Sequence, residues 1–147
     1  MDTYVESFLK TGESFTRIDQ FDGPLEDKFY IEGAIVCRIR GQQLLTLKHW
    51  DLVDQLWAYL IEPLITVSDG RVYDSCFPDQ PLRLRLAPGT NDCVTVTIGD
   101  KSRTVRHDEI VATLSKGGEH FFREMKRLAP DDSANWDHQL ERLQSLN

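Results

Sequence analysis

The stretch LRLRLAPGTNDCVTVTIGDKSRTVRHDEIVATLSKGGEHFFREMKRL, residues 82–128, decides the fold class. Over 82–86 and 93–98 apolar and polar residues alternate, which is typical of strands with one buried face. The turn-forming residues 88–92 separate these two segments. Gly99-Asp100 then predicts a two-residue hairpin turn into another strand. Over 108–128 the apolar residues recur with the period of an amphipathic helix. Strands joined by short turns and followed by such a helix predict an antiparallel sheet covered by helices.

The same signals extend toward the N-terminus. Residues 29–40 are rich in aromatic and β-branched residues, as strands are. Gly41-Gln42 suits a two-residue turn, so we expect residues 43–48 to return as the second strand of a hairpin. Residues 51–62 place their large apolar side chains on one side of a helix. Pro63 cannot donate a helical hydrogen bond, and we expect it to end or kink that helix.

The remaining segments complete the pattern. Residues 1–28 are acidic and poor in apolar side chains, and we expect a short helix over Tyr4–Leu9 in an otherwise extended lead-in. Residues 71–77 are a further candidate strand, and the spacing of Trp136, Leu140 and Leu143 predicts a short C-terminal helix. Gly117-Gly118 leaves two interpretations open: close approach of the long helix to a strand, or a break in that helix.

Together these elements predict an α+β fold. It consists of an antiparallel sheet of about five or six strands, with two amphipathic helices and a short C-terminal helix packed on one face. We expect one domain spanning 1–147, with an acidic lead-in over 1–28 and a compact core over 29–147.

The net charge of the protein restricts the classes of partner that it can bind. A net charge of −7 disfavours binding to nucleic acid or to an anionic membrane, and it is compatible with a basic protein partner. No apolar run approaches the roughly 20 residues that cross a bilayer. The first residues lack the basic and apolar regions of a signal peptide, so we expect a cytoplasmic protein.

Fragments that resemble catalytic motifs do not converge. Ser7-x-x-Lys10 overlaps a Lys-Thr-Gly match through the same lysine, whereas serine acyltransferases need two separate segments. His120 and Glu124 supply two metal ligands where zinc needs three or four. The three cysteines lie in strand-like stretches and are interpreted as buried thiols (Cys37, Cys76, Cys93). We therefore expect no catalytic residues, no metal and no cofactor.

Carboxylates are dense around the helix predicted over 51–62 and the turns that follow it. Solvated acids explain them as single residues, but together they are the best candidate for a partner-binding surface. The candidate partner-binding residues are Asp51, Asp54, Glu62, Asp69, Asp74 and Asp79.

The stretch WDLVDQLWAYL (50–60), followed by FPDQP (77–81), looks like segments of small bacterial proteins that resemble toxin-immunity proteins. The likeness spans roughly residues 30–136 and concerns size, acidity and layout. It implies a protein that neutralises a cognate toxin, with no catalytic residues of its own.

Two functional hypotheses remain. The first is a non-enzymatic protein-binding module, an immunity protein that occludes the active site of a basic toxin such as a nuclease. The alternative is a small enzyme or ligand-binding protein with a pocket between the sheet and the helices, near His107. The absence of a convergent nucleophile and base, or of a metal-ligand set, favours the first.

Overall fold

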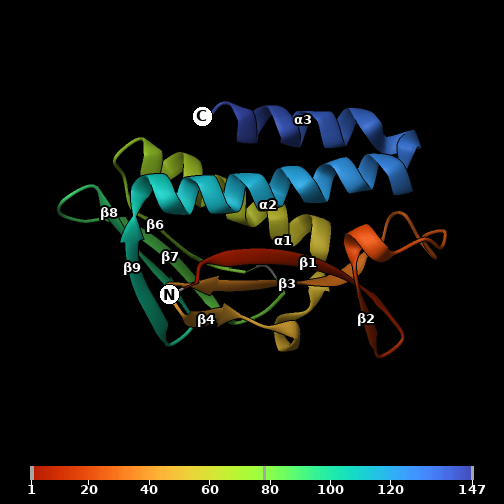
Figure 1. Cartoon of the computed structure of the whole chain (residues 1–147), viewed down its shortest axis with the longest axis horizontal. Coiled ribbons are helices and arrows are strands. Elements are labelled where there is room, and N and C mark those ends of the chain that lie inside the picture. The colour runs from red at the N-terminus through yellow and green to blue at the C-terminus, as the bar shows by residue number, and fades with distance from the viewer. Residues whose placement is uncertain (1, 78, 147) are drawn as a thin grey trace.

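The computed structural model describes residues 2–77 and 79–146, and it is an α+β fold with two antiparallel sheets (Figure 1). The first sheet has the order β2-β1-β3-β4, and β5 also pairs with β3. Its strands are β1 (Tyr4–Thr11), β2 (Ser14–Arg17), β3 (Glu32–Ile39), β4 (Gln42–Leu45) and β5 (Asp51–Leu52). The second sheet has the order β6-β7-β8-β9. Its strands are β6 (Tyr73–Cys76), β7 (Arg83–Pro88), β8 (Cys93–Ile98) and β9 (Lys101–Arg106).

The helices form two further layers. Figure 1 shows α1 and α2 against the sheets and α3 on the outer side of α2. The helices are α1 (Val53–Ser68), α2 (His107–Leu128) and α3 (Ser133–Gln144), with short 3-10 turns η1 (Ile18–Gln20), η2 (Leu47–His49) and η3 (Pro130–Asp132). The α+β class, the antiparallel pairing and the three helices are therefore confirmed. Within the described residues, no helix has the length and apolar character needed to cross a membrane.

The strands divide over two sheets instead of forming one. The chain leaves the first sheet through α1 and enters the second at β6. Among residues 2–77 and 79–146, β4 forms no hydrogen-bonded ladder with the second sheet. The Arg103 side chain of β9 links the two sheets. Its guanidinium donates a hydrogen bond to the carbonyl oxygen of Arg40, in the β3–β4 turn, at 2.8 Å. The sequence pattern predicts strands but not which sheet each one joins.

The Tyr4–Leu9 segment is part of a strand, and the helix expected there is wrong. β1 pairs with β2 on one side and with β3 on the other. Ser7 and Leu9 are buried, while Phe8 between them is only partly buried, which is the period-2 pattern of a strand. The segment is therefore an inner strand of the first sheet and not a peripheral lead-in.

Two local predictions need correction. The β3–β4 turn consists of Arg40 and Gly41, both with positive φ (49° and 81°), so it begins one residue earlier than expected. Helix α1 begins at Val53 and continues past Pro63 to Ser68, because Leu64 and Val67 are buried in the same core as the residues before the proline. The hairpin at Gly99-Asp100 is confirmed, with Ile98 opposite Lys101.

Helix α2 runs unbroken through Gly117-Gly118, which settles the two interpretations in favour of close approach. A Cβ on Gly117 would lie 2.1 Å from Val5 Cγ1 in β1. A Cβ on Gly118 would lie 2.8 Å from Leu143 Cδ1 in α3 and 3.2 Å from the Trp57 ring. The two glycines therefore let α2 contact a strand and both other helices at one level.

The core centres on Trp57 of α1. Its ring centre lies 6.2 Å from that of Phe121, and aromatic contacts continue through Phe122 to Trp136. The Trp57 indole N–H donates to Ser7 Oγ at 2.9 Å, so this buried polar group has a partner. Apolar residues from both sheets and all three helices join the same cluster, from Leu9 to Leu143.

We expect Gly117→Ala to lower the free energy of unfolding. Alanine favours a helix by about 1 kcal/mol over glycine, but overpacking against Val5 costs about 1–3 kcal/mol. Chemical denaturation of the single variant, of Val5→Ala and of the double variant measures the coupling. The clash predicts that Gly117→Ala costs less in the Val5→Ala background. Stabilisation of similar size in both backgrounds would contradict the close approach.

The two buried serines should respond in opposite ways. Ser7→Ala removes the acceptor of the buried Trp57 N–H, which should cost about 1–3 kcal/mol of unfolding free energy. Ser115 Oγ in α2 is buried and has no hydrogen-bond partner within the part of the chain that the structure describes. Ser115→Ala should therefore leave the unfolding free energy unchanged or raise it. Thermal denaturation of the two variants checks this, and equal destabilisation would exclude a special role for the Trp57–Ser7 bond.

Candidate protein-binding surface

The six candidate carboxylates do not form one stripe along a helix. Asp51 lies in β5, and only Asp54 and Glu62 belong to α1. Asp69 follows the C-terminus of α1, and Asp74 lies in β6. Asp79 lies outside any strand or helix, one residue before Gln80. In the structure the six carboxylates fall into two groups, one with ion pairs and one without.

Three of the six carboxylates are neutralised by arginines. Glu62 pairs with Arg142 of α3, which is 80 residues away in sequence. Asp69 lies 3.5 Å from Arg71. Asp74 accepts two hydrogen bonds from Arg83 and lies 3.4 Å from Arg85. The Arg83 hydrogen bond holds the pKa of Asp74 below its usual value. This group therefore offers little free negative charge.

The other three, Asp51, Asp54 and Asp79, have no ion pair among the described residues. The carboxylate of Asp51 accepts from the backbone N–H of Leu52 at 2.8 Å and from the Gln80 amide at 3.3 Å. Partial burial raises the pKa of Asp54, and the negative charge of Asp132 raises it further. The charges of Asp54 and Asp132 therefore interact near the N-terminal end of α1.

Exposed aromatic rings lie beside these carboxylates. Phe29 is 84% exposed, Tyr30 57% and Trp50 42%. Phe29 and Tyr30 belong to a turn that precedes β3, since their backbone N–H groups donate to the side chain and to the carbonyl oxygen of Asp27. The strand expected from Phe29 therefore begins at Glu32. The Asp27 turn leaves both rings in solvent.

Strand pairing brings the rings and the carboxylates to one end of the molecule. The backbone N–H of Val53 donates to the carbonyl oxygen of Ile31 at 2.9 Å, which places Asp54 next to the turn that carries Tyr30. Gly33 of β3 pairs with Asp51 of β5, directly after Trp50. The ammonium of Lys10 lies 4.2 Å from the centre of the Trp50 ring and lines a small cavity together with Tyr30.

Further acids surround the rings. Asp131 in η3 and Glu26 lie with Phe29 around one shallow depression, and Lys28 lies 3.7 Å from Asp131. We call this region the aromatic–acidic end. It comprises Phe29, Tyr30 and Trp50 with Glu26, Asp27, Glu32, Asp51, Asp54, Asp131 and Asp132. The three rings were missed from sequence, and their only signal was aromatic residues directly beside turn-forming and charged ones.

The fragments that resemble catalytic motifs do not come together in the structure. Ser7 Oγ accepts from Trp57, and Lys10 Nζ donates to the carbonyl oxygen of Gly12 at 2.6 Å. His107 Nε2 lies 3.2 Å from Ser68 Oγ, and His120 lies 3.8 Å from Asp19. Among residues 2–77 and 79–146, no three His, Cys, Asp or Glu side chains are grouped to hold a metal ion.

The expectation of three buried thiols holds for one of them. Cys37 is buried, and burial raises the pKa of its thiol to about 12. Cys76 is exposed and Cys93 is half-buried, so the prediction is wrong for both. Cys76 is exposed because it lies at the end of β6, an edge strand whose residues are largely open to solvent.

Comparisons of this chain with protein-family models, with curated proteins and with solved structures found no match.

Proposed function

We propose that this protein is a non-enzymatic protein-binding module, and specifically an immunity protein that neutralises a basic bacterial toxin in the cytoplasm. It would do so by covering the toxin's active site with the aromatic–acidic end. The observation that carries the proposal is the placement of three exposed rings among seven carboxylates. Within the described residues, only Asp131 of these carboxylates has an ion pair, which it forms with Lys28.

The rings supply the anchors that a long-lived complex needs. Large aromatic side chains dominate binding energy at interfaces, because each buries a wide apolar area at little cost in side-chain entropy. Phe29 is almost fully exposed, so nearly its whole ring is available for burial on a partner. Trp50 and Tyr30 add ring area together with polar N–H and O–H groups that can form hydrogen bonds at the edge of a contact.

The carboxylates supply the steering field. Toxins that cut nucleic acid need a basic groove, because contacts to phosphate provide much of their affinity. Asp51, Asp54 and Asp131 can occupy positions that phosphates would take in such a groove. Complementary charge raises association rates above roughly 10⁵–10⁶ M⁻¹s⁻¹, the range of uncharged pairs. In this proposal, neither a metal nor a cofactor takes part in binding.

A cavity between the sheet and α2 supports the alternative of a small ligand-binding protein. It has a volume of about 550 Å³ and lies between β1 and α2, but His107 is not among its lining residues. The charged and titratable residues that line it are Tyr4, Glu6, Arg17, Asp19, Lys116 and His120. Asp19 lies 3.5 Å from Arg17 and 3.8 Å from His120.

Reversing charge at the aromatic–acidic end should slow binding to the toxin encoded beside this protein's gene. Glu26→Lys with Asp131→Lys changes two exposed carboxylates and should lower the association rate about tenfold at low salt. Asp69→Lys with Asp92→Lys is the matched control, because both residues are exposed and lie outside this end. Stopped-flow association at low and high salt measures the effect, and equal slowing by both pairs would place the interface elsewhere.

Removing a ring should act on dissociation instead. Phe29→Ala should cost about 2–4 kcal/mol of binding free energy, mostly through faster dissociation, as expected for an aromatic anchor. Val72→Ala is the control, because Val72 is an exposed apolar residue on the segment between α1 and β6. Surface plasmon resonance compares the two dissociation rates. If Phe29→Ala dissociates as slowly as the control, Phe29 is not an anchor.

A further inference from the structure

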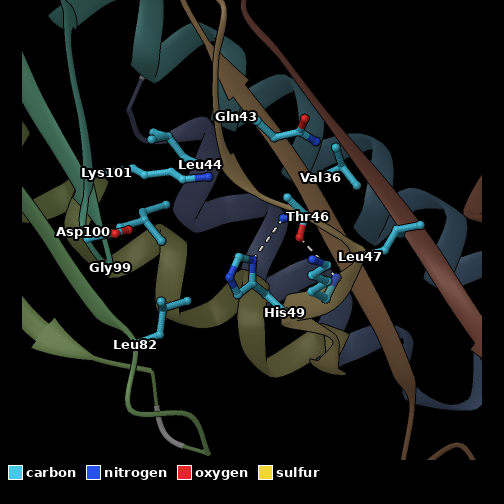
Figure 2. A pocket seen from close by; sticks show the side chains of 12 residues that line it. Val36, Gln43, Leu44, Thr46, Leu47, His49, Leu82, Gly99, Asp100 and Lys101 are labelled. Carbon is cyan, nitrogen blue, oxygen red and sulfur yellow. Dashed lines mark hydrogen bonds between the residues drawn. The ribbon is translucent and has the colours of Figure 1, made fainter.

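A second cavity, of about 750 Å³, lies in the gap between the two sheets (Figure 2). One wall comes from β3, β4 and η2 of the first sheet, and the other from the segment before β7 and the β8–β9 turn of the second. The volume falls within the roughly 300–1,000 Å³ typical of small-molecule sites. Its apolar lining residues are Val36, Leu44, Leu47, Leu82 and Ile98.

The charge of this cavity is opposite to that of the protein as a whole. The chain carries a net charge of −7, yet the lining residues include Lys48, Lys101 and His49 and only one carboxylate, Asp100. Neither lysine has an ion pair within the described residues, whereas most of the arginines do. Figure 2 shows Lys101 extending from the β9 side toward β4. Two ammonium groups therefore stand at an apolar cavity with their charge largely uncompensated.

The geometry of His49 fixes a hydrogen-bond donor at the same place. The backbone N–H of Thr46 donates to His49 Nδ1 at 3.1 Å, and Thr46 Oγ1 accepts from the backbone N–H of Lys48. Because Nδ1 is the acceptor, the proton of the neutral ring is on Nε2. Figure 2 shows this other edge of the ring turned toward the Gly99–Asp100 turn. His49 can thus donate Nε2–H to an acceptor inside the cavity.

We propose that this cavity binds a small organic anion with an apolar body, such as a medium-chain carboxylate. Its charged oxygens accept hydrogen bonds from Lys101 Nζ and from His49 Nε2–H. Its apolar body lies against Leu44, Leu82 and Ile98. The lining residues of this cavity are distinct from the residues of the aromatic–acidic end, although His49 directly precedes Trp50. The anion-binding proposal does not depend on the toxin-binding proposal.

The electrostatics of His49 agree with an anion site. Burial lowers the pKa of His49, and the positive charges of Lys101 and Lys48 lower it further. A bound anion would relieve the repulsion among these groups, whereas a cation would add to it.

Titration calorimetry with octanoate and 1-octanol near neutral pH tests the proposal, since the two probes share an apolar chain and differ in charge. We expect saturable octanoate binding at one site and affinity for octanol at least about tenfold lower. Lys101→Met keeps the apolar stem and removes the charge, and it should weaken octanoate about tenfold, the effect of losing a charged hydrogen bond. Lys126→Met on α2 is the control, because Lys126 is exposed and lines neither this cavity nor the one between β1 and α2.

Long-range ¹H–¹⁵N NMR locates the site independently. It should show His49 as the Nε2–H tautomer in the free protein, and octanoate should shift the His49 ring signals more than those of His107 or His138. The proposal is overturned if octanoate does not bind saturably, or if octanol binds equally well. It is also overturned if Lys101→Met behaves like the control, or if the His49 signals do not move.

Discussion

The fold depends on the close approach of α2 to β1, α1 and α3 at Gly117-Gly118. Side chains from all three elements occupy the space that two Cβ atoms would fill, namely Val5, Trp57 and Leu143. Trp57 is the shared contact, and its indole N–H is satisfied by Ser7 of β1. The contacts at Gly117-Gly118 therefore set the distances from α2 to the first sheet, to α1 and to α3. Any side chain at this point must displace a strand, a tryptophan or a helix.

This arrangement also determines what the surface displays. With Trp57 fixed in the core, the N-terminal end of α1 is held against β3 by the Val53–Ile31 hydrogen bond and by β5. Asp51 and Asp54 are consequently held beside the turn that carries Phe29 and Tyr30. At the opposite end of α1, Arg71, Arg83 and Arg142 neutralise the other carboxylates. The result is one end where exposed rings lie among carboxylates, most of which have no ion pair within the described residues.

Local sequence signals predicted the elements better than their arrangement. The Gly99-Asp100 hairpin and the long α2 followed from turn chemistry and from the helical period. Over a segment as short as Tyr4–Leu9, the apolar residues fit the period of a helix as well as that of a strand. The segment is a strand because it pairs with β2 on one side and with β3 on the other. Part of the candidate site also follows from the sequence, since Asp51 and Asp54 belong to the dense carboxylates of the helix predicted over 51–62. The pairing of Glu62 with Arg142 spans 80 residues, and the exposure of Phe29 depends on a turn, so neither could be read from spacing.

Under our proposal, a basic partner covers the aromatic–acidic end. Hydrogen–deuterium exchange of the protein, alone and in complex with the proposed toxin partner, measures which surface is covered. We expect slower exchange in peptides that cover residues 26–33 and 50–55, where the rings and most of the carboxylates lie, and unchanged exchange over 68–76. Protection confined to 68–76, or to the cavity between the sheets, with none at 26–33, would rule out this interface.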